Sequence, residues 1–308
     1  MKNICFVFPG QGSQTVGMGQ DLLHDGHAKA VLQEAEEALK FNLGKLMLEG
    51  PAEELTLTQN AQPALLVCGL MAFSYLTKQA GLGIEGLAGH VAGHSLGEYT
   101  AVAAAGGMGF ATAAQLVRLR GEAMVRGGGT GGMSAILGLE PEVADKVAAE
   151  NGVVFANDNA VGQAIFSGPL DKLALAEEAA KAAGAKRALR LNVSGPFHTP
   201  VMRGAAEEVG AFLAAHPLAD LKVPCVMNLS AEPVREARAV AAGLVAQVTG
   251  RVRWREGMVH LANTGVTQVV ELGVGKVLAG LAGRCDGRLS GVSLDSRVSI
   301  DAWLEARG

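Results

Sequence analysis

The chain has 308 residues, of which 49% are hydrophobic and 18% are charged, as in ordinary globular proteins. This length suits one large domain or two modest ones. The formal net charge of -4 gives no general electrostatic reason to bind nucleic acid or an anionic membrane. No apolar run approaches the roughly 18 residues of a spanning helix, so we expect a soluble, cytoplasmic protein.

The four cysteines are far apart in the chain and include no C-x-x-C pair; they are Cys5, Cys68, Cys225 and Cys285. Neither a disulfide framework nor a zinc site is indicated, and we expect small core residues instead.

The first third of the chain alternates strand and helix patterns. We predict a strand at 3–8, helices at 28–40 and 63–80, and a second strand at 87–93. Pro63 is expected in the first turn of its helix. An Ala-rich segment after Ser95 predicts a further helix, so that Ser95 lies in a sharp turn between a strand and a helix.

A glycine-rich segment at 127–132 suits a hinge, and shorter elements follow it. They are a strand at 133–139, a helix at 141–150, strands at 153–157 and 163–167, a helix at 170–183 and a strand at 188–193. This β-α-β-β-α-β order is typical of ferredoxin-like domains.

After His198 longer helices return, with strands predicted at 223–229 and 269–272. We therefore expect an α/β protein. Residues 1–127 and 199–308 would form a large α/β-hydrolase-like domain with a parallel sheet, and residues 128–198 a small inserted ferredoxin-like α+β domain.

The G-x-S-x-G pattern formed by Gly93, Ser95 and Gly97 is that of a nucleophile elbow. There the serine hydroxyl stands at a helix N-terminus, where free N–H groups stabilise an oxyanion. An ordinary helix N-cap is the competing interpretation, because serine is favoured at that position.

A serine nucleophile needs a base, and the chain offers seven histidines. His198 is the best candidate, because Pro196 and Pro200 hold it in a constrained, non-helical segment. The others suit structural or solvated positions, and they are His24, His27, His90, His94, His216 and His260.

Six motifs in order resemble the malonyl-CoA:acyl-carrier-protein transacylase family and cover nearly the whole chain. They are FPGQGSQ (8–14), TQNAQPALL (58–66), GHSLGEYTA (93–101), RLRGEAM (118–124), VSGPFHTPVM (193–202) and ELGVGKVLAGL (271–281). The resemblance implies that Ser95 accepts the acyl group and that His198 is its base. It also implies that a backbone carbonyl at Gln247 orients the histidine, and that the N–H groups of Gln11 and Leu96 form the oxyanion hole.

The same resemblance assigns Arg120 to the free carboxylate of a malonyl group, and guanidinium suits that role because it offers two parallel donors. Phe197 and Gln62 are placed in the substrate pocket. Malonyl-CoA and acyl carrier protein are the implied partners of a monomer that needs no metal and no cofactor.

Carrier proteins of this pathway are acidic, so a basic rim is expected, although a solvated charged face is the favoured interpretation for each single candidate. The candidates are Lys186, Arg187, Arg190, Arg251, Arg253 and Arg255. The segment 157–163 departs from the family pattern, with Asp158 in place of an aromatic residue. We expect Asp158 in a surface turn rather than as a third catalytic group.

Three alternatives remain at this point. An α/β serine hydrolase also presents G-x-S-x-G, but it usually places Asp or Glu and then His after the serine. A malonyl-selective acyltransferase of a polyketide pathway would use nearly the same residues. A non-catalytic carrier-binding subunit would have lost some of Gln11, Ser95, Arg120 and His198, all of which are present.

Overall fold

The first strand, β1 (Ile4–Phe8), is apolar throughout, and all five of its residues are buried. Side chains alternate between the two faces of a strand. Accordingly, Cys5 and Val7 belong to one hydrophobic cluster and the other three residues to a second cluster. A strand buried on both faces is typical of a parallel sheet with helices on either side.

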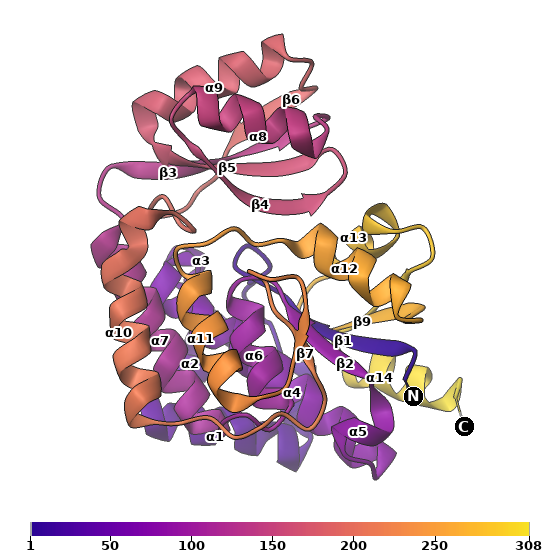
Figure 1. The fold of residues 1–308 in the computed structure, drawn as a ribbon. Helices are drawn as coiled ribbons and strands as arrows, with labels where there is room; N and C mark the ends of the chain where they lie inside the picture. The colour runs from indigo at the N-terminus through magenta and orange to yellow at the C-terminus, as the bar shows by residue number, and fades with distance from the viewer. Residues whose placement is uncertain (1, 308) are drawn as a thin grey trace.

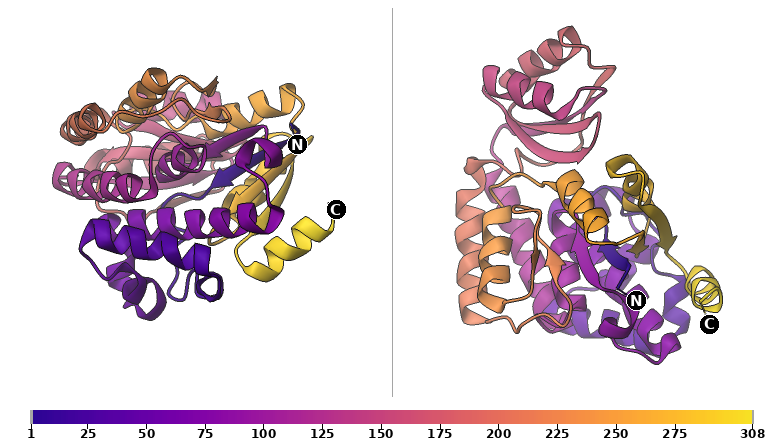
Figure 2. Two further views of the ribbon diagram at one scale, coloured as in Figure 1. Left: turned by 90° about the horizontal axis from the view of Figure 1, so that it is seen from below. Right: turned by 45° about the vertical axis from the view of Figure 1, so that its right-hand side comes forward.

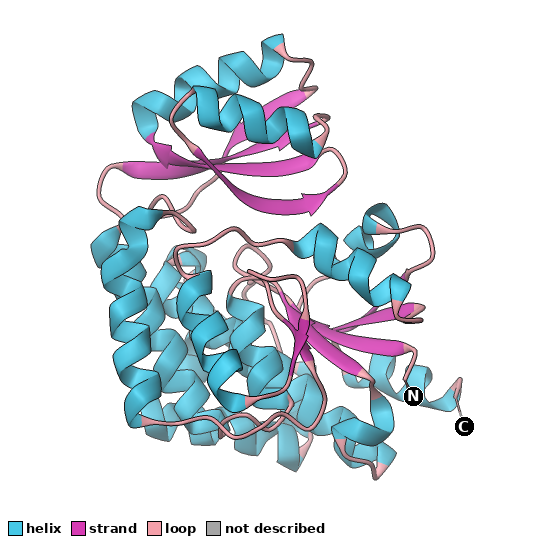
Figure 3. Ribbon diagram, viewed as in Figure 1, coloured by secondary structure: helices cyan, strands magenta, loops and turns pink. Residues whose placement is uncertain are grey.

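The structure is a computed structural model that describes residues 2–307. Its larger sheet has the strand order β10-β9-β1-β2-β7-β8, and all neighbours are parallel except β7 and β8. Figures 1 and 3 show this sheet apart from a second, smaller one. The strands that accompany β1 are β2 (His90–Gly93), β7 (Cys225–Val226), β8 (Pro233–Val234), β9 (Gln268–Leu272) and β10 (Ser290–Leu294).

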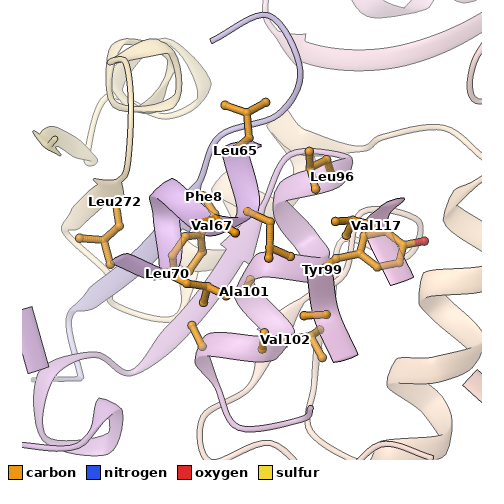
Figure 4. Packing of buried hydrophobic residues seen from close by; sticks show 14 of the residues in the cluster. Phe8, Leu65, Val67, Leu70, Leu96, Tyr99, Ala101, Val102, Val117 and Leu272 are labelled. Atoms are coloured by element: carbon orange, nitrogen blue, oxygen red, sulfur yellow. The ribbon is translucent and has the colours of Figure 1, made fainter. Parts of the chain in front are cut away.

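Helices cover both faces of the larger sheet. On one face lie α12 (Trp254–Asn263) and α13 (Val277–Cys285), which share a cluster with Cys5 and Val7. The other face carries the larger cluster, in which Phe8 packs with residues of α4 (Thr58–Ala80) and α6 (Leu96–Ala104) (Figure 4). The remaining helices of this part are η1 (Asp21–His24), α1 (Gly26–Leu39), α2 (Leu43–Glu49), α3 (Ala52–Thr56), α5 (Ile84–Leu87), α7 (Phe110–Gly127), η2 (Pro200–Met202), α10 (Arg203–Ala215), α11 (Ala237–Gln247) and α14 (Arg297–Glu305).

Helix α4 begins five residues before Pro63, so the expectation of Pro63 in a first turn is wrong. Proline has no N–H, and the carbonyl four residues earlier loses its helical donor. That carbonyl belongs to Gln59, and it accepts a hydrogen bond from Arg118 Nη1 at 3.3 Å. The side chain of Arg118 is 29% exposed and stabilises the helix across the proline.

The smaller sheet has the order β4-β5-β3-β6 and is antiparallel throughout. Two split β-α-β units build it, because β5 lies between β3 and β4, and β3 lies between β5 and β6. Its helices α8 and α9 pack on one face around their own hydrophobic cluster. Its elements are β3 (Gly131–Leu137), α8 (Pro141–Glu150), β4 (Val154–Ala160), β5 (Gln163–Pro169), α9 (Leu170–Ala182) and β6 (Arg187–Arg190).

The smaller sheet contacts the rest of the protein through its edge strand β4. The larger sheet and the helices that cover it are called the larger part below. Figures 1 and 2 show β4 beside the larger part, with α8 and α9 on the opposite side of the sheet. Asn157 forms a parallel bridge with Val252, whose N–H donates to the Ala156 carbonyl at 2.8 Å. The backbone N–H of Asp158 donates to the Val252 carbonyl at 2.9 Å.

All four cysteines are free and buried, which confirms them as core residues. The strand predicted at 223–229 is only two residues long in β7. It ends early because Asn228 bonds outside the sheet, where its carbonyl accepts from the Arg253 N–H at 2.8 Å.

The close contact between α6 and the end of β1 gives a first test. A Cβ on Gly97 would lie 2.0 Å from the Phe8 carbonyl oxygen, which is backbone and cannot move aside. We expect Gly97→Ala to lower the free energy of unfolding in urea by at least about 3 kcal/mol. The matched control is Gly204→Ala in α10, where no atom lies within 4 Å of the added Cβ. It should be neutral or stabilising by about 1 kcal/mol, and equal losses in the two variants would contradict the steric argument.

Candidate active site

Ser95 lies in the turn between β2 and α6, at the N-cap position of the helix. Its backbone has φ 50° and ψ -104°, which is unusual for a residue other than glycine. A Cβ on Gly93 would lie 1.8 Å from the Gly97 carbonyl carbon, so the turn tolerates only glycine at position 93. The Ser95 hydroxyl makes no capping hydrogen bond to the helix. Ser95 thus occupies the N-cap position, but the interpretation of its hydroxyl as a helix cap is wrong.

The Ser95 Oγ atom lies 2.8 Å from Nε2 of His198. The other ring nitrogen, Nδ1, lies 2.9 Å from the Gln247 carbonyl oxygen. A carbonyl can only accept, so Nδ1 carries the proton and Nε2 is left to accept the hydroxyl proton of Ser95. The pair is therefore arranged to move a proton from oxygen to nitrogen.

Burial lowers the pKa of His198, the nearby Arg120 cation lowers it in the same direction, and the resulting pKa is about 3. The imidazole is consequently neutral near pH 7. A neutral imidazole is the form that can take a proton from the serine.

Arg120 comes from α7, and it is 1% exposed. Its Nη2 donates to Ser95 Oγ at 3.1 Å and to Gln247 Oε1 at 2.9 Å, while Nη1 donates to Gln62 Oε1 at 2.8 Å. Its guanidinium carbon lies 5.0 Å from the centroid of the Tyr99 ring. All of these partners are uncharged, and Nε has no partner among the described residues. The site thus holds a buried cation that lacks a direct carboxylate partner within residues 2–307.

A cavity of about 160 Å³ opens in front of these groups, which is room for a few carbon and oxygen atoms. Seven of the eight residues predicted for the site line it: Gln11, Gln62, Ser95, Leu96, Arg120, Phe197 and His198. The eighth, Gln247, lies behind Ser95, His198 and Arg120 and bonds to all three. A wider groove of about 460 Å³ adjoins the cavity and shares Gln11 and Val193 with it.

Two backbone N–H groups at this cavity, those of Gln11 and Leu96, have no acceptor among the described residues. Leu96 is the first residue of α6, where helix geometry leaves N–H groups free. The Gln11 side chain is fixed by a hydrogen bond of 3.1 Å from its Nε2 to Thr58 Oγ1. Free donors at a helix N-terminus can stabilise negative charge that develops beside Ser95.

Sequence reasoning missed two residues beneath the serine. Asn228 accepts the Ser95 N–H through Oδ1 at 2.8 Å and donates through Nδ2 to the Gly93 carbonyl at 2.7 Å. Glu98 is fully buried and accepts from the Asn228 N–H and from Gln247 Nε2. Burial raises the pKa of Glu98 to about 8. A signal was present, because Glu98 is the one charged residue in the otherwise apolar segment 96–105.

His94 also lies at the cavity, and it keeps the structural character expected of it. Its Nε2 lies 2.7 Å from Asn159 Oδ1, and its ring lies 5.7 Å from that of Trp254. Burial lowers the pKa of His94, so the ring is uncharged. Within the part of the chain that the structure describes, no group of three or more His, Cys, Asp or Glu residues could hold a metal ion.

The expectation that Asp158 lies in a surface turn is wrong. It lies in β4 and is 2% exposed, and its carboxylate forms a two-pronged ion pair with Arg255 at 2.7 and 3.0 Å. Asp and Asn suit turns by composition, but here the hairpin turn falls after Ala160 and the strand runs through. Both carboxylate oxygens face Arg255, which comes from α12. The ion pair therefore connects the smaller sheet to a helix that packs on the larger sheet.

Four of the six basic candidates for a carrier-binding rim are paired with acidic side chains. Arg190 pairs with Glu177, Arg251 with Asp145, Arg253 with Glu256, and Arg255 with Asp158. Lys186 and Arg187 have no ion pair within residues 2–307, and Arg187 is exposed.

Among residues 2–307, none of the helices combines the length and the apolar composition needed to cross a membrane.

Comparison with known proteins identifies the family of the chain. The acyl transferase domain family matches residues 5–280. The malonyl CoA-acyl carrier protein transacylase of Bacillus subtilis (strain 168) is 42% identical over 313 residues, covering 99% of this chain and 97% of the relative. The protein of the same name from Escherichia coli (strain K12) is 39% identical over 312 residues, covering 99% and 100%.

Solved structures show the same fold. The acyl-carrier-protein-S-malonyltransferase from Bartonella henselae matches with a TM-score of 0.95 and 39% identity, over 99% of each chain. A malonyl-transacylase in complex with its type II PKS acyl-carrier protein matches with a TM-score of 0.94 and 36% identity, over 99% of this chain and 100% of the other.

The chain belongs to the acyl transferase family, which matches most of its length, and it is therefore an acyltransferase; the mixed α/β fold and the serine at the elbow agree with this class. Within that family it groups with the malonyl CoA-acyl carrier protein transacylases.

The ion pair between Asp158 and Arg255 gives a second test. Arg255→Ala leaves a buried carboxylate without its cation, which costs about 3 to 5 kcal/mol of unfolding free energy. Burial already raises the pKa of Asp158, and loss of the cation raises it further. Such an acid binds its proton more readily in the folded state, so the folded variant loses stability as pH rises above the unfolded pKa. Urea unfolding should therefore show a large deficit at pH 8 and a small one near pH 4, and a deficit independent of pH would contradict this account.

Proposed function

We propose that the protein transfers a malonyl group from malonyl-CoA to the phosphopantetheine thiol of an acyl carrier protein, through a malonyl ester on Ser95. The observation that carries this proposal is the position of Ser95 Oγ, 2.8 Å from His198 Nε2 and 3.1 Å from Arg120 Nη2. A nucleophile, a base and a buried cation meet at one oxygen atom. The proteins that match the chain are named for this transfer.

In the first half-reaction, Ser95 Oγ attacks the thioester carbonyl while His198 Nε2 takes the hydroxyl proton. The carbonyl oxygen becomes an oxyanion, and the free N–H groups of Gln11 and Leu96 are its proposed donors. The tetrahedral intermediate then collapses, the carbon–sulfur bond breaks, and coenzyme A leaves as a thiol with the proton from His198. The Gln247 carbonyl keeps the imidazole in the required tautomer throughout.

The free carboxylate of the malonyl group pairs with Arg120, which lacks a carboxylate partner in the described residues. This pairing also changes the pKa of the base, His198. The Arg120 charge is the second cause, after burial, of the low pKa of His198. A carboxylate on Arg120 offsets that charge and raises the proton affinity of His198, so the correct substrate strengthens the base that attacks with it.

In the second half-reaction, the carrier's pantetheine thiol gives its proton to His198 Nε2 and attacks the ester carbonyl of malonyl-Ser95. The carbon–oxygen bond breaks, and Ser95 recovers its proton from the imidazolium. The reaction is an exchange of one thioester for another, and none of its steps calls for a metal ion or a redox cofactor. Phe197 and Gln62 line the cavity and are proposed to shape it around a straight malonyl group.

Two alternative functions use the same serine and histidine. A serine hydrolase acting on neutral esters has no use for the buried Arg120, so transfer is favoured. A polyketide-pathway acyltransferase would use this site unchanged, and one matching structure is titled as a complex with a type II PKS acyl-carrier protein. We propose fatty acid synthesis, the pathway that the resemblance of the sequence motifs implies. The intact set of Gln11, Ser95, Arg120 and His198 disfavours a decayed, non-catalytic subunit.

We propose further that residues 128–198 form an inserted ferredoxin-like domain and that residues 1–127 and 199–308 form an α/β-hydrolase-like domain. The two split β-α-β units of the smaller sheet support the first assignment, and the elbow after β2 supports the second. The protein is proposed to act as a cytoplasmic monomer, with acyl carrier protein reaching the cavity through the adjoining groove.

Covalent loading of Ser95 is a direct test. Intact mass spectrometry after mixing with malonyl-CoA should show one malonyl adduct on the wild type and none on Ser95→Ala. Addition of holo acyl carrier protein should remove the adduct and place it on the carrier. Apo carrier, which lacks the thiol, is the control and should leave the adduct in place. Release of free malonate at the same rate with and without carrier would instead indicate a hydrolase.

The role of Arg120 is tested by its selectivity. Hydrogen bonds to a charged group contribute about 1.5 to 3 kcal/mol, so Arg120→Ala should slow malonyl loading about 10- to 150-fold in rapid-quench experiments. Acetyl loading, which offers no carboxylate, should change less than about threefold. The matched control is Arg118→Ala on the same helix, which should leave the ratio of malonyl to acetyl loading unchanged. An equal loss of both activities in Arg120→Ala would show that Arg120 is structural.

A further inference from the structure

One buried side chain lies beneath the whole site without reaching the cavity. Glu98 is in α6, one helical turn after Ser95, and it has no exposed surface. One carboxylate oxygen accepts from the backbone N–H of Asn228, and the other accepts from Gln247 Nε2 at 2.8 Å. It forms no direct ion pair with any described residue. A fully buried carboxyl group is costly, so its presence calls for an explanation.

The two partners of Glu98 hold the backbone of Ser95 from both sides. The Asn228 side chain accepts the Ser95 N–H at 2.8 Å, and Gln247 Nε2 donates to the Ser95 carbonyl at 2.7 Å. Ser95 has a strained backbone, with φ 50° and ψ -104°. Strain of this kind persists only where the surroundings fix the conformation. The two side-chain amides bond Ser95's own N–H and carbonyl, and the Glu98 N–H donates to the same carbonyl at 3.2 Å.

Gln247 also links Glu98 to the other two reacting groups. Its carbonyl accepts from His198 Nδ1 at 2.9 Å, and its Oε1 accepts from Arg120 Nη2 at 2.9 Å. The side-chain amide can serve Arg120 only if its oxygen points that way, which turns Nε2 toward Glu98. Both oxygens of Glu98 accept N–H groups, one from Asn228 and the other from Gln247, and this fixes the orientation of the Gln247 amide.

We propose that Glu98 is a positioning residue for acyl transfer: it holds the backbone of Asn228 and the side chain of Gln247, and through these two residues it sets the geometry of Ser95, His198 and Arg120. This inference rests on the proposed function of Ser95 as the nucleophile. Glu98 touches neither the substrate nor the reacting atoms, and its effect passes through the two amides.

Glutamine is an informative replacement, because it has the same shape and only one acceptor. In Glu98→Gln the amide oxygen can accept the Asn228 N–H, and its NH2 group then faces Gln247 Nε2. Two donors meet, or Gln247 turns its amide and presents NH2 to Arg120 and oxygen to the Ser95 carbonyl. Either arrangement disturbs the serine while leaving the fold and the cavity lining in place.

The test measures the reactivity of Ser95 with an uncharged alkyl 4-nitrophenyl phosphonate ester, which has no carboxylate to pair with Arg120. Ser95 Oγ displaces 4-nitrophenolate from phosphorus and the hydroxyl proton passes to the base, so one coloured product forms for each serine modified. We expect Glu98→Gln to react at least about 30-fold more slowly than the wild type, with a parallel fall in malonyl loading. Far-ultraviolet circular dichroism and urea unfolding establish that the variant is folded.

The matched control is Glu271→Gln. Glu271 is also fully buried, its pKa is also raised by burial, and it accepts a backbone N–H from Ala279 at 2.8 Å, but it bonds to no residue of the site. The Glu271→Gln variant should react with the phosphonate at a rate within about threefold of that of the wild type. A folded Glu98→Gln that also reacts within threefold would show that Glu98 only supports the fold, and would overturn the proposal.

If Glu98→Gln does not accumulate as folded protein, Asn228→Ala provides the same comparison, because it keeps the carboxylate and removes one of the two amides. We expect its phosphonate reaction to slow at least about tenfold, and an unchanged rate would contradict the proposal. The proposed function fails in a different way. A wild type that reacts with the phosphonate but takes up no malonyl group would refute the transferase activity and leave the role of Glu98 measurable.

Discussion

The contact between Gly97 and the Phe8 carbonyl is the constraint on which the site depends. Because only hydrogen fits there, α6 can begin directly against the end of β1, and the turn that follows β2 becomes very short. The short turn forces the Ser95 backbone to a positive φ of 50°, which costs about 1 to 3 kcal/mol of conformational free energy. The position of the serine is thus set by the packing of a helix on a parallel sheet. A nucleophile placed in this way is held more tightly than one on a mobile loop, which suits a reaction that depends on alignment.

The buried charge of Arg120 is the second organising feature. Uncharged oxygen atoms of Ser95, Gln62 and Gln247 satisfy some of its N–H groups, but none of them offsets its charge. Leaving a cation buried in this way lowers the stability of the empty protein. It also sharpens discrimination, because a ligand with a carboxylate gains an ion pair in a water-poor cavity and a ligand without one leaves the cation unpaired. The unpaired charge of Arg120 therefore lowers the stability of the protein and raises its selectivity for a ligand with a carboxylate.

The elements and groups that the sequence predicted are those that depend on short-range patterns. Strand β1, the elbow at Ser95 and the constrained His198 each follow from a few neighbouring residues, and the family resemblance assigns Arg120 and Gln247. Asn228 could not be found this way, because its role requires β7 to lie beside β2, which is a property of strand order. Asp158 was placed wrongly for a related reason. Its local sequence suits a turn, and its partner Arg255 lies 97 residues further along the chain.

The serine and the histidine belong to segments that approach the cavity from different sheets. Ser95 follows β2 of the larger sheet, whereas His198 lies on the segment that returns from the smaller one. The segment before the imidazole is held from the smaller sheet by Ser167 Oγ, which donates to the Phe197 carbonyl at 2.7 Å, and the imidazole itself is held from the larger part by Gln247. The reacting pair is therefore assembled only when the smaller sheet is seated on the larger part. The bridge from β4 to Val252 and the buried ion pair between β4 and α12 lie where the smaller sheet contacts the larger part. Contacts remote from the chemistry therefore help to set the distance between Ser95 Oγ and His198 Nε2.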